Sequence, residues 1–182
     1  MHTDIKPDNV LVFKEGDIYV GKVIDFGFAC FGASDTTKVN IPAVSPVWKA
    51  PEVHRYAGYG NDQQSFTIGE AKRIDAFSFG KVCAWILFWD DHSLEDLSEL
   101  SPPFELDTAL VRQLLQPERS TGLTDQFVNA MQLKLEGFFH SSYISDPEQR
   151  MPFHTLSRQL TGIIRAWEVE YVLHLAFAQP DM

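Results

Sequence analysis

The chain has 182 residues, 45% of them hydrophobic, which is enough for one domain with a substantial apolar core. Lys and Arg number 15 against 25 Asp and Glu, and the resulting net charge of −10 argues against nucleic-acid binding through clustered basic residues. No signal peptide is recognisable, and the longest apolar run is too short to span a bilayer. Because the two cysteines match neither a metal site nor a disulfide framework, we expect an intracellular protein, cytoplasmic or nuclear, with no membrane partner.

The first predicted element is a β-hairpin near the amino terminus. Residues 10–13 and 18–24 are rich in β-branched residues, and a Gly-Asp turn separates them. Polar residues flank the hairpin, with Asp4 and Asn9 before it and Asp25 after it. The hairpin therefore brings two carboxylates and an amide to neighbouring places. Hard oxygen ligands of this kind suit Mg²⁺, which proteins hold with a few carboxylates together with substrate phosphates.

The middle of the chain combines irregular and helical segments. Residues 28–49 show no sustained periodicity, and a loop of this length is usually functional or disordered. A short helix is expected from Pro51, and residues 57–66 are loop-like in composition. A further helix is expected over residues 75–89. After Lys81 this segment is apolar on every face, which predicts a central buried helix.

The last part of the chain is predicted to be mainly helical. Residues 90–107 are acidic and lack Lys and Arg, which favours a solvated acidic loop, with a preference for basic substrates as the alternative. Amphipathic helices are expected over residues 107–115 and 124–139, and a last helix over 154–167, after a turn at 146–150. The apolar stripes of the last two helices are Phe127, Met131, Leu135 and Phe138, and Leu156, Leu160, Ile163, Ile164 and Trp167.

Three short motifs stand in order along the chain: His2-Thr3-Asp4 followed by Asn9, then Asp25-Phe26-Gly27, then Ala50-Pro51-Glu52. Their order and spacing resemble the H-R-D-x-x-x-x-N, D-F-G and A-P-E motifs of the eukaryotic protein kinases. Lys6, two residues after Asp4, is similar to the serine/threonine type. The resemblance implies an α+β, predominantly α fold, the large C-terminal kinase lobe with a small hairpin. On this view residues 1–178 form a partial kinase domain and 179–182 a tail.

The resemblance implies catalytic roles for three residues. Asp4 would orient a substrate hydroxyl and accept its proton, and Lys6 would contact the transferred phosphate. Ser45, where the family usually has Thr, could bridge Asp4 and Lys6. On chemistry alone each residue also has an ordinary interpretation, as a turn aspartate, a solvated lysine and a loop serine.

ATP and Mg²⁺ are the cofactors that the resemblance implies. Asn9 and Asp25 would be the metal ligands, and Gly27 would permit the backbone geometry of the metal loop. Leu11 would form the floor of the adenine pocket. The alternatives are turn residues at strand ends for Asn9 and Asp25 and simple core for Leu11.

Other matched residues would hold the lobe together. Glu52 and Arg150 resemble a buried ion pair of the family, and loss of one partner would leave a buried charge. Asp75 would cap the central helix and tie it to the backbone of the catalytic loop. His2 and Phe26 match part of an apolar stack.

The sequence also departs from the family pattern. Thr3 replaces the Arg of H-R-D, so phosphorylation at Ser34, Thr36 or Thr37 has no obvious cationic partner. Residues 53–74 are longer than the common pattern, and we assign them no role.

The sequence lacks a Gly-rich loop, a V-A-I-K lysine and the helix glutamate that pairs with it. We therefore expect the N-terminal nucleotide lobe to be absent and the chain alone to have little activity. The expected partners are a protein substrate with a Ser or Thr hydroxyl and a missing lobe, or another protein, that covers the apolar face of Val82, Trp85, Ile86 and Trp89. A non-catalytic binding module and an incomplete gene product remain as alternatives.

Overall fold

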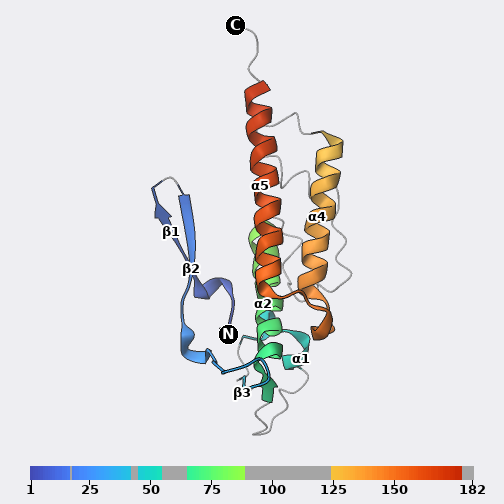
Figure 1. The fold of residues 1–182 in the computed structure, drawn as a ribbon. Helices are drawn as coiled ribbons and strands as arrows, with labels where there is room; N and C mark the ends of the chain where they lie inside the picture. The colour runs from blue at the N-terminus through green and yellow to red at the C-terminus, as the bar shows by residue number, and fades with distance from the viewer. Residues whose placement is uncertain (17, 42–44, 55–64, 89–123, 178–182) are drawn as a thin grey trace.

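The computed structural model describes residues 1–16, 18–41, 45–54, 65–88 and 124–177. Three long helices, α2, α4 and α5, run side by side, and a two-stranded hairpin stands to one side of them (Figure 1). The amino terminus lies beside α2, between the hairpin and the helices. The predicted mixture of helices with little sheet is confirmed.

The amino-terminal hairpin is confirmed. Strand β1, Val10–Glu15, pairs antiparallel with β2, Ile18–Val23, so that Val10 lies opposite Val23. Most of its large apolar side chains are exposed: Leu11, Val12, Phe13, Ile18, Tyr19 and Val23. Because an isolated two-stranded hairpin is at best marginally stable in water, these side chains mark a surface that packing against another element would stabilise.

A second small sheet was not predicted. Strand β3, Lys38–Asn40, pairs antiparallel with β4, Ser65–Thr67, and the predictions of loop over residues 28–49 and 57–66 are wrong where these strands lie. Three-residue strands carry too little periodicity to be recognised in a sequence. The rest of 57–66 lies outside the described residues. Single turns of 3-10 helix make up η1 Pro7–Asn9, η2 Phe26–Phe28, η3 Pro46–Trp48 and η6 Pro147–Gln149.

Helix α2, Ile68–Phe88, begins well before the predicted start. Its first turn is closed by a capping box, in which the Glu70 amide donates to Thr67 Oγ1 (3.2 Å) and the Thr67 amide donates to Glu70 Oε2 (2.6 Å). Asp75 therefore lies inside the helix, and the prediction that it caps the helix is wrong.

Helices α4, Asp125–Tyr143, and α5, Phe153–Phe177, pack against α2 and against each other. The predicted apolar stripe of α4 is confirmed, since Met131, Leu135 and Phe138 are buried. On α5 the stripe is only partly right: Leu156 is buried, but Ile164 is 47% exposed. The short helix α1, Pro51–His54, is also confirmed. The predictions for residues 90–107 and 107–115 lie outside the described residues.

The carboxyl-terminal half of α2 is covered unevenly. Val82 is buried, which contradicts the expected exposure, whereas Trp85 is half-buried and Ile86 is 61% exposed. Gly80 allows a close approach of α2 to α4, because a Cβ there would fall on Ser142 Oγ and lie 2.6 Å from Ser142 Cβ. Trp89 lies outside the described residues. None of the helices in the described ranges is long and apolar enough to cross a membrane.

Candidate active site

The backbone at the start of the chain adopts an unusual conformation that α2 holds in place. Thr3 has a φ of 64°, a region that β-branched residues rarely adopt. The two oxygens of Asp75 accept the amide hydrogens of His2 (2.7 Å) and Thr3 (2.8 Å), and Thr3 Oγ1 donates to the carbonyl of Phe28 (2.6 Å). The predicted tie between Asp75 and this loop is therefore confirmed.

Asp75 is an acid in a dry environment. Burial raises the pKa of its carboxyl group, and the hydrogen bonds from the His2 and Thr3 amides act in the opposite direction but are outweighed. Two donated hydrogen bonds thus fix the carboxylate without fully replacing the water that it has lost.

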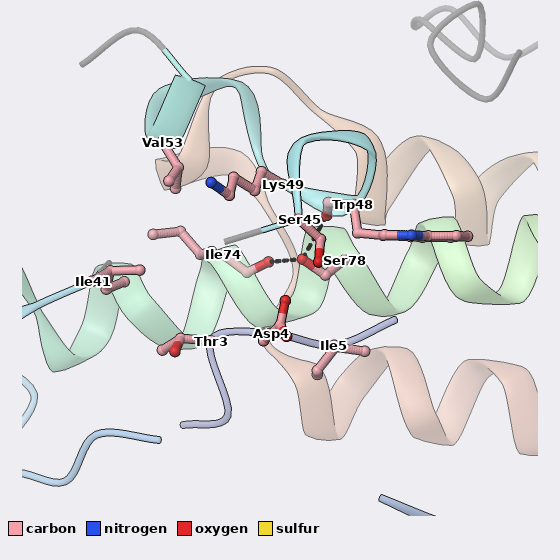
Figure 2. Close-up of a pocket in the computed structure, with 10 residues that line it drawn as sticks. All are labelled: Thr3, Asp4, Ile5, Ile41, Ser45, Trp48, Lys49, Val53, Ile74 and Ser78. Carbon is pink, nitrogen blue, oxygen red and sulfur yellow. Dashed lines mark hydrogen bonds between the residues drawn. The ribbon is translucent and has the colours of Figure 1, made fainter. Parts of the chain in front are cut away.

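Asp4 is the buried centre of the loop, with an exposed fraction of 5%. Its Oδ2 lies 2.9 Å from Lys6 Nζ and accepts a 3.2 Å hydrogen bond from Asn9 Nδ2, which also donates to the Asp4 carbonyl (2.9 Å). Figure 2 shows the carboxylate pointing into a small pocket. Since Oδ2 already has two donors, Oδ1 is the oxygen suited to accept a further proton.

Lys6 joins Asp4 to the loop that contains Ser45. Its Nζ donates a 2.9 Å hydrogen bond to Ser45 Oγ while it pairs with Asp4. The three predicted catalytic residues are therefore brought together, but the lysine is the bridging group and not the serine. A flexible ammonium with three donors can span two acceptors in this way.

Two further side chains of α2 hold the Ser45 loop, and the sequence analysis assigned a site role to neither. Ser78 Oγ donates to the Trp48 carbonyl (2.8 Å), and Lys81 Nζ donates to the Val47 carbonyl (2.7 Å). Together with Asp75 they recur every third residue of one helix, a spacing that is visible in the sequence.

Asp25 lies at the open end of the hairpin and is exposed. It has a φ of 60°, and its Oδ1 accepts the Gly27 amide hydrogen (3.2 Å). The left-handed residue of this loop is thus Asp25 and not Gly27. Gly27 is suited to the position for a different reason, because a Cβ there would lie 3.1 Å from Asp25 Oδ1.

Asn9 and Asp25, the predicted magnesium ligands, are linked through the backbone. The Asn9 carbonyl accepts the Ile24 amide hydrogen (2.9 Å), which ties the residue before Asp25 to Asn9. Because Asn9 Nδ2 is directed at Asp4 and Asp25 Oδ1 at Gly27, Asn9 Oδ1 and Asp25 Oδ2 are the atoms suited to a hard cation. Within the described ranges no group of three His, Cys, Asp or Glu could hold a metal unaided, so phosphate and water oxygens would complete the shell.

The remaining predicted residues lie around the hairpin. His2 and Phe26 contact each other edge to face with ring centroids 5.2 Å apart, as predicted. Leu11 is 43% exposed on β1, opposite Lys22. Its position leaves the adenine-pocket role as a prediction.

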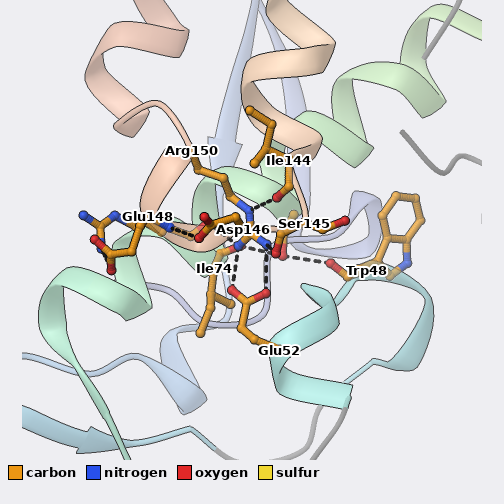
Figure 3. Close-up of polar contacts among 10 residues, drawn as sticks. Trp48, Glu52, Ile74, Ile144, Ser145, Asp146, Glu148 and Arg150 are labelled. Carbon is orange, nitrogen blue, oxygen red and sulfur yellow. Dashed lines mark hydrogen bonds and ion pairs between the residues drawn. The ribbon is translucent and has the colours of Figure 1, made fainter. Parts of the chain in front are cut away.

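The predicted ion pair below the site is confirmed (Figure 3). Arg150 donates from Nη1 and Nη2 to the two oxygens of Glu52, at 2.6 and 2.8 Å. The Arg150 side chain is fully buried, and it also donates to the Ile144 carbonyl (2.7 Å) and lies over the Phe77 ring. This bidentate pair connects α1 to the turn before α5. Because α1 directly follows the loop that contains Ser45, the pair also fixes the end of that loop.

Comparisons with known proteins agree with this geometry. A family model described as "Protein kinase domain" matches residues 1–158. The chain is 28% identical over 165 residues to CBL-interacting protein kinase 25 of Oryza sativa subsp. japonica, covering 82% of this chain and 30% of that protein. It is 27% identical over 156 residues to serine/threonine-protein kinase pakA of Talaromyces marneffei, covering 86% of this chain and 20% of that protein.

A shorter stretch of the chain is more similar to a third relative. Over 70 residues it is 40% identical to serine/threonine-protein kinase shk2 of Schizosaccharomyces pombe, covering 38% of this chain and 11% of that protein. The chain thus spans less than a third of the length of these relatives. No solved structure matches it significantly.

Proposed function

Because the chain belongs to the protein kinase domain family, we propose that it carries the catalytic loop of a serine/threonine kinase that transfers the γ-phosphate of ATP to a protein hydroxyl. The observation that supports this most directly is the hydrogen-bonded set of Asp4, Lys6, Asn9 and Ser45. A buried carboxylate with one oxygen fixed by two donors and the other directed at a pocket is suited to orient a hydroxyl.

The proposed chemistry divides among these residues. Asp4 Oδ1 accepts the proton of the substrate hydroxyl as the hydroxyl oxygen bonds to the γ-phosphorus of ATP, and the bond from that phosphorus to the bridging oxygen breaks, so that ADP leaves. Lys6 offsets negative charge at the transferred group. It also fixes the positions of Asp4 and Ser45 relative to each other, because its ammonium group contacts both. Asn9 and Asp25 would hold Mg²⁺, which when bound neutralises phosphate charge.

We further propose that a second lobe, or another intracellular protein, covers the hairpin and contributes part of the nucleotide-binding site. The exposed apolar residues of β1 and β2, including Leu11 and Phe13, support this proposal. On this basis residues 1–182 alone bind Mg·ATP weakly and transfer little phosphate. A radiolabelled transfer assay measures this, and robust transfer that Asp4→Ala abolishes would overturn the need for a second lobe.

A thermal-shift titration tests the nucleotide site itself. We expect Mg·ATP to raise the melting temperature of the wild-type chain, because a ligand that binds only the folded state stabilises it. Asp25→Asn should abolish that shift, whereas Asp35→Asn, an exposed carboxylate paired with Lys72 away from the site, should keep it. An equal shift in Asp25→Asn would contradict a nucleotide site at Asp25 and favour the non-catalytic binding module instead.

A further inference from the structure

Thr3 replaces the arginine of the family motif, and the proposed function gives it no role. The residue is buried, with an exposed fraction of 6%. Its Oγ1 donates a 2.6 Å hydrogen bond to the carbonyl of Phe28, three residues after Asp25. The hydroxyl therefore joins the loop that contains the proposed base, Asp4, to the loop that contains a proposed metal ligand.

The backbone conformation at this position does not by itself favour threonine. The φ of Thr3 is 64°, in the left-handed region where a β-branched side chain is strained and where Gly or Asn is accommodated more easily. The hydrogen bonds from the His2 and Thr3 amides to Asp75 hold this conformation, but any residue other than proline could donate them. What threonine adds is the hydroxyl group, and that group binds the Phe28 carbonyl.

The loop around Asp25 is tied to the start of the chain on both sides of this residue. Before Asp25, His2 Nε2 donates to the Ile24 carbonyl (2.9 Å). After Asp25, Thr3 Oγ1 donates to the Phe28 carbonyl. The Asp25 side chain is exposed, so burial does not fix its position. Ties to the backbone of the loop, and not packing, therefore decide where this carboxylate lies.

Loss of the Thr3 hydroxyl should loosen this loop without unfolding the domain. Phe28 is 42% exposed, so water can reach the loop and replace the lost bond to its carbonyl. Asp75 would still accept the amide hydrogen of Thr3. The loop would then exchange among several conformations, and only some of them would let the Asp25 carboxylate share a cation with Asn9. Ligand affinity falls in proportion to the fraction of molecules in the competent conformation.

We propose that Thr3 is a positioning residue whose hydroxyl holds the loop of Asp25 in the conformation that binds Mg·ATP. This inference rests on the proposed function, because it takes Asp25 as a ligand of the nucleotide-bound metal. The partner of the hydroxyl is a backbone carbonyl of the chain itself. The contact therefore requires no phosphorylation of the segment that follows the loop.

Cysteine labelling of the full chain tests the hold on the loop without any ligand. Cys30, two residues after Phe28, is half-buried, whereas Cys83 is buried in α2. Timed reaction with iodoacetamide, read by mass spectrometry, gives a separate rate for each thiol. Thr3→Val, which keeps the branched shape but lacks the hydroxyl, should raise the rate at Cys30 about three- to tenfold, as the loss of one hydrogen bond provides. The rate at Cys83 should stay unchanged, because the fold remains intact.

Further variants assign the effect to the hydroxyl group. Thr3→Ser keeps the hydroxyl and should label at Cys30 like the wild-type chain. Thr161→Val is the matched control, because it removes an exposed threonine hydroxyl that donates to the Ser157 carbonyl (2.8 Å) on α5, and it should leave both rates unchanged. Circular dichroism melting checks that each variant folds, and Thr3→Ala replaces Thr3→Val if that variant does not.

Nucleotide binding then connects the loop to the proposed site. A thermal-shift titration with Mg·ATP, extended to millimolar concentrations, should give an apparent dissociation constant about three- to tenfold weaker for Thr3→Val than for the wild-type chain. Thr3→Ser should restore the wild-type value. Weaker binding beside an unchanged rate at Cys83 is an effect that a merely structural role of Thr3 would not produce.

Three labelling outcomes overturn the proposal: an unchanged rate at Cys30 in Thr3→Val, an equal rise at Cys83, or a Thr3→Ser variant that labels like Thr3→Val. Equal Mg·ATP binding by the wild-type chain and Thr3→Val, beside weaker binding by Asp25→Asn, rejects the role of Thr3 alone. If Asp25→Asn binds Mg·ATP as well as the wild-type chain does, the nucleotide site of the proposed function is rejected, and labelling of Cys30 still decides whether Thr3 holds the loop.

Discussion

The two sides of the candidate active site differ in how they are supported. On the helix side, Asp4 and Asn9 are buried and joined by a hydrogen bond. The backbone at the start of their loop donates a hydrogen bond to Asp75 of α2. On the hairpin side, Asp25 and Leu11 are exposed on a two-stranded ribbon. The same set of motifs therefore contains residues fixed by the fold and residues free to adjust to a ligand. The first kind should affect stability when changed and the second mainly binding.

The largest effect is expected on the helix side, at the ion pair of Arg150 and Glu52. Glu52→Ala leaves a fully buried guanidinium without its carboxylate, which should lower the free energy of unfolding by about 3–5 kcal/mol. The matched control is Glu148→Ala, which removes an equally short 2.6 Å pair with Arg73 whose side chains are 70% and 31% exposed. It should cost at most about 1 kcal/mol. Urea unfolding measures both, and equal losses would contradict the contrast.

An intermediate effect is expected at Asp75. Asp75→Asn keeps the size of the side chain but replaces one acceptor oxygen with a donor, so either the His2 or the Thr3 amide loses its partner. The free energy of unfolding at neutral pH should fall by about 1–3 kcal/mol. The measurement is again urea unfolding, and an unchanged midpoint would show that the loop is held by other contacts.

The same variant should change the pH dependence of stability. Because the pKa of Asp75 is raised in the folded state, the folded chain binds the proton more tightly than the unfolded chain does. The contribution of this group to stability is therefore greatest at low pH and declines as pH rises from the ordinary aspartate value of about 4 through the raised value. Asp75→Asn should remove that decline, and a parallel pH profile for the two proteins would contradict it.

The smallest effect on stability is expected on the hairpin side. Asp25→Asn should change the free energy of unfolding by less than about 0.5 kcal/mol, since the side chain is exposed and an amide oxygen can still accept from Gly27. Thermal melting without ligand measures this. A large loss would mean that Asp25 is part of the folded framework, and the difference between the two sides would disappear.

The sequence predicted the residues of the candidate site better than it predicted the side chains that hold the loops of the site in place. Asp4, Lys6 and Asn9 are close along the chain, and the resemblance of their spacing to the kinase motif predicted that they belong to one site. The Glu52–Arg150 pair was predicted only through the resemblance to the kinase motifs, because its two residues are 98 apart in the sequence. Ser78 and Lys81 instead bind backbone carbonyls, which every residue supplies. A contact with a carbonyl leaves no signal in its partner's side chain.

The start of α2 was missed for a different reason. The capping box of Thr67 and Glu70 is readable in the sequence, but it follows a stretch whose composition is typical of a loop. The helix was therefore placed from its apolar segment, which begins later. The strand β4 directly before it has only three residues, and its pairing with β3 depends on a contact distant in sequence.

The three-residue intervals of Asp75, Ser78 and Lys81 make the length of this helical segment as important as its composition. Each residue turns an α-helix by about 100°, so residues three apart lie about 60° from each other around the axis, and Asp75 and Lys81 lie about 120° apart. A single inserted or deleted residue between Asp75 and Ser78 would rotate one loop anchor away from the other. The loop that contains Asp4 and the loop that contains Ser45 would then no longer be held in the same relative position. We therefore expect an insertion or deletion within residues 75–81 to be poorly tolerated.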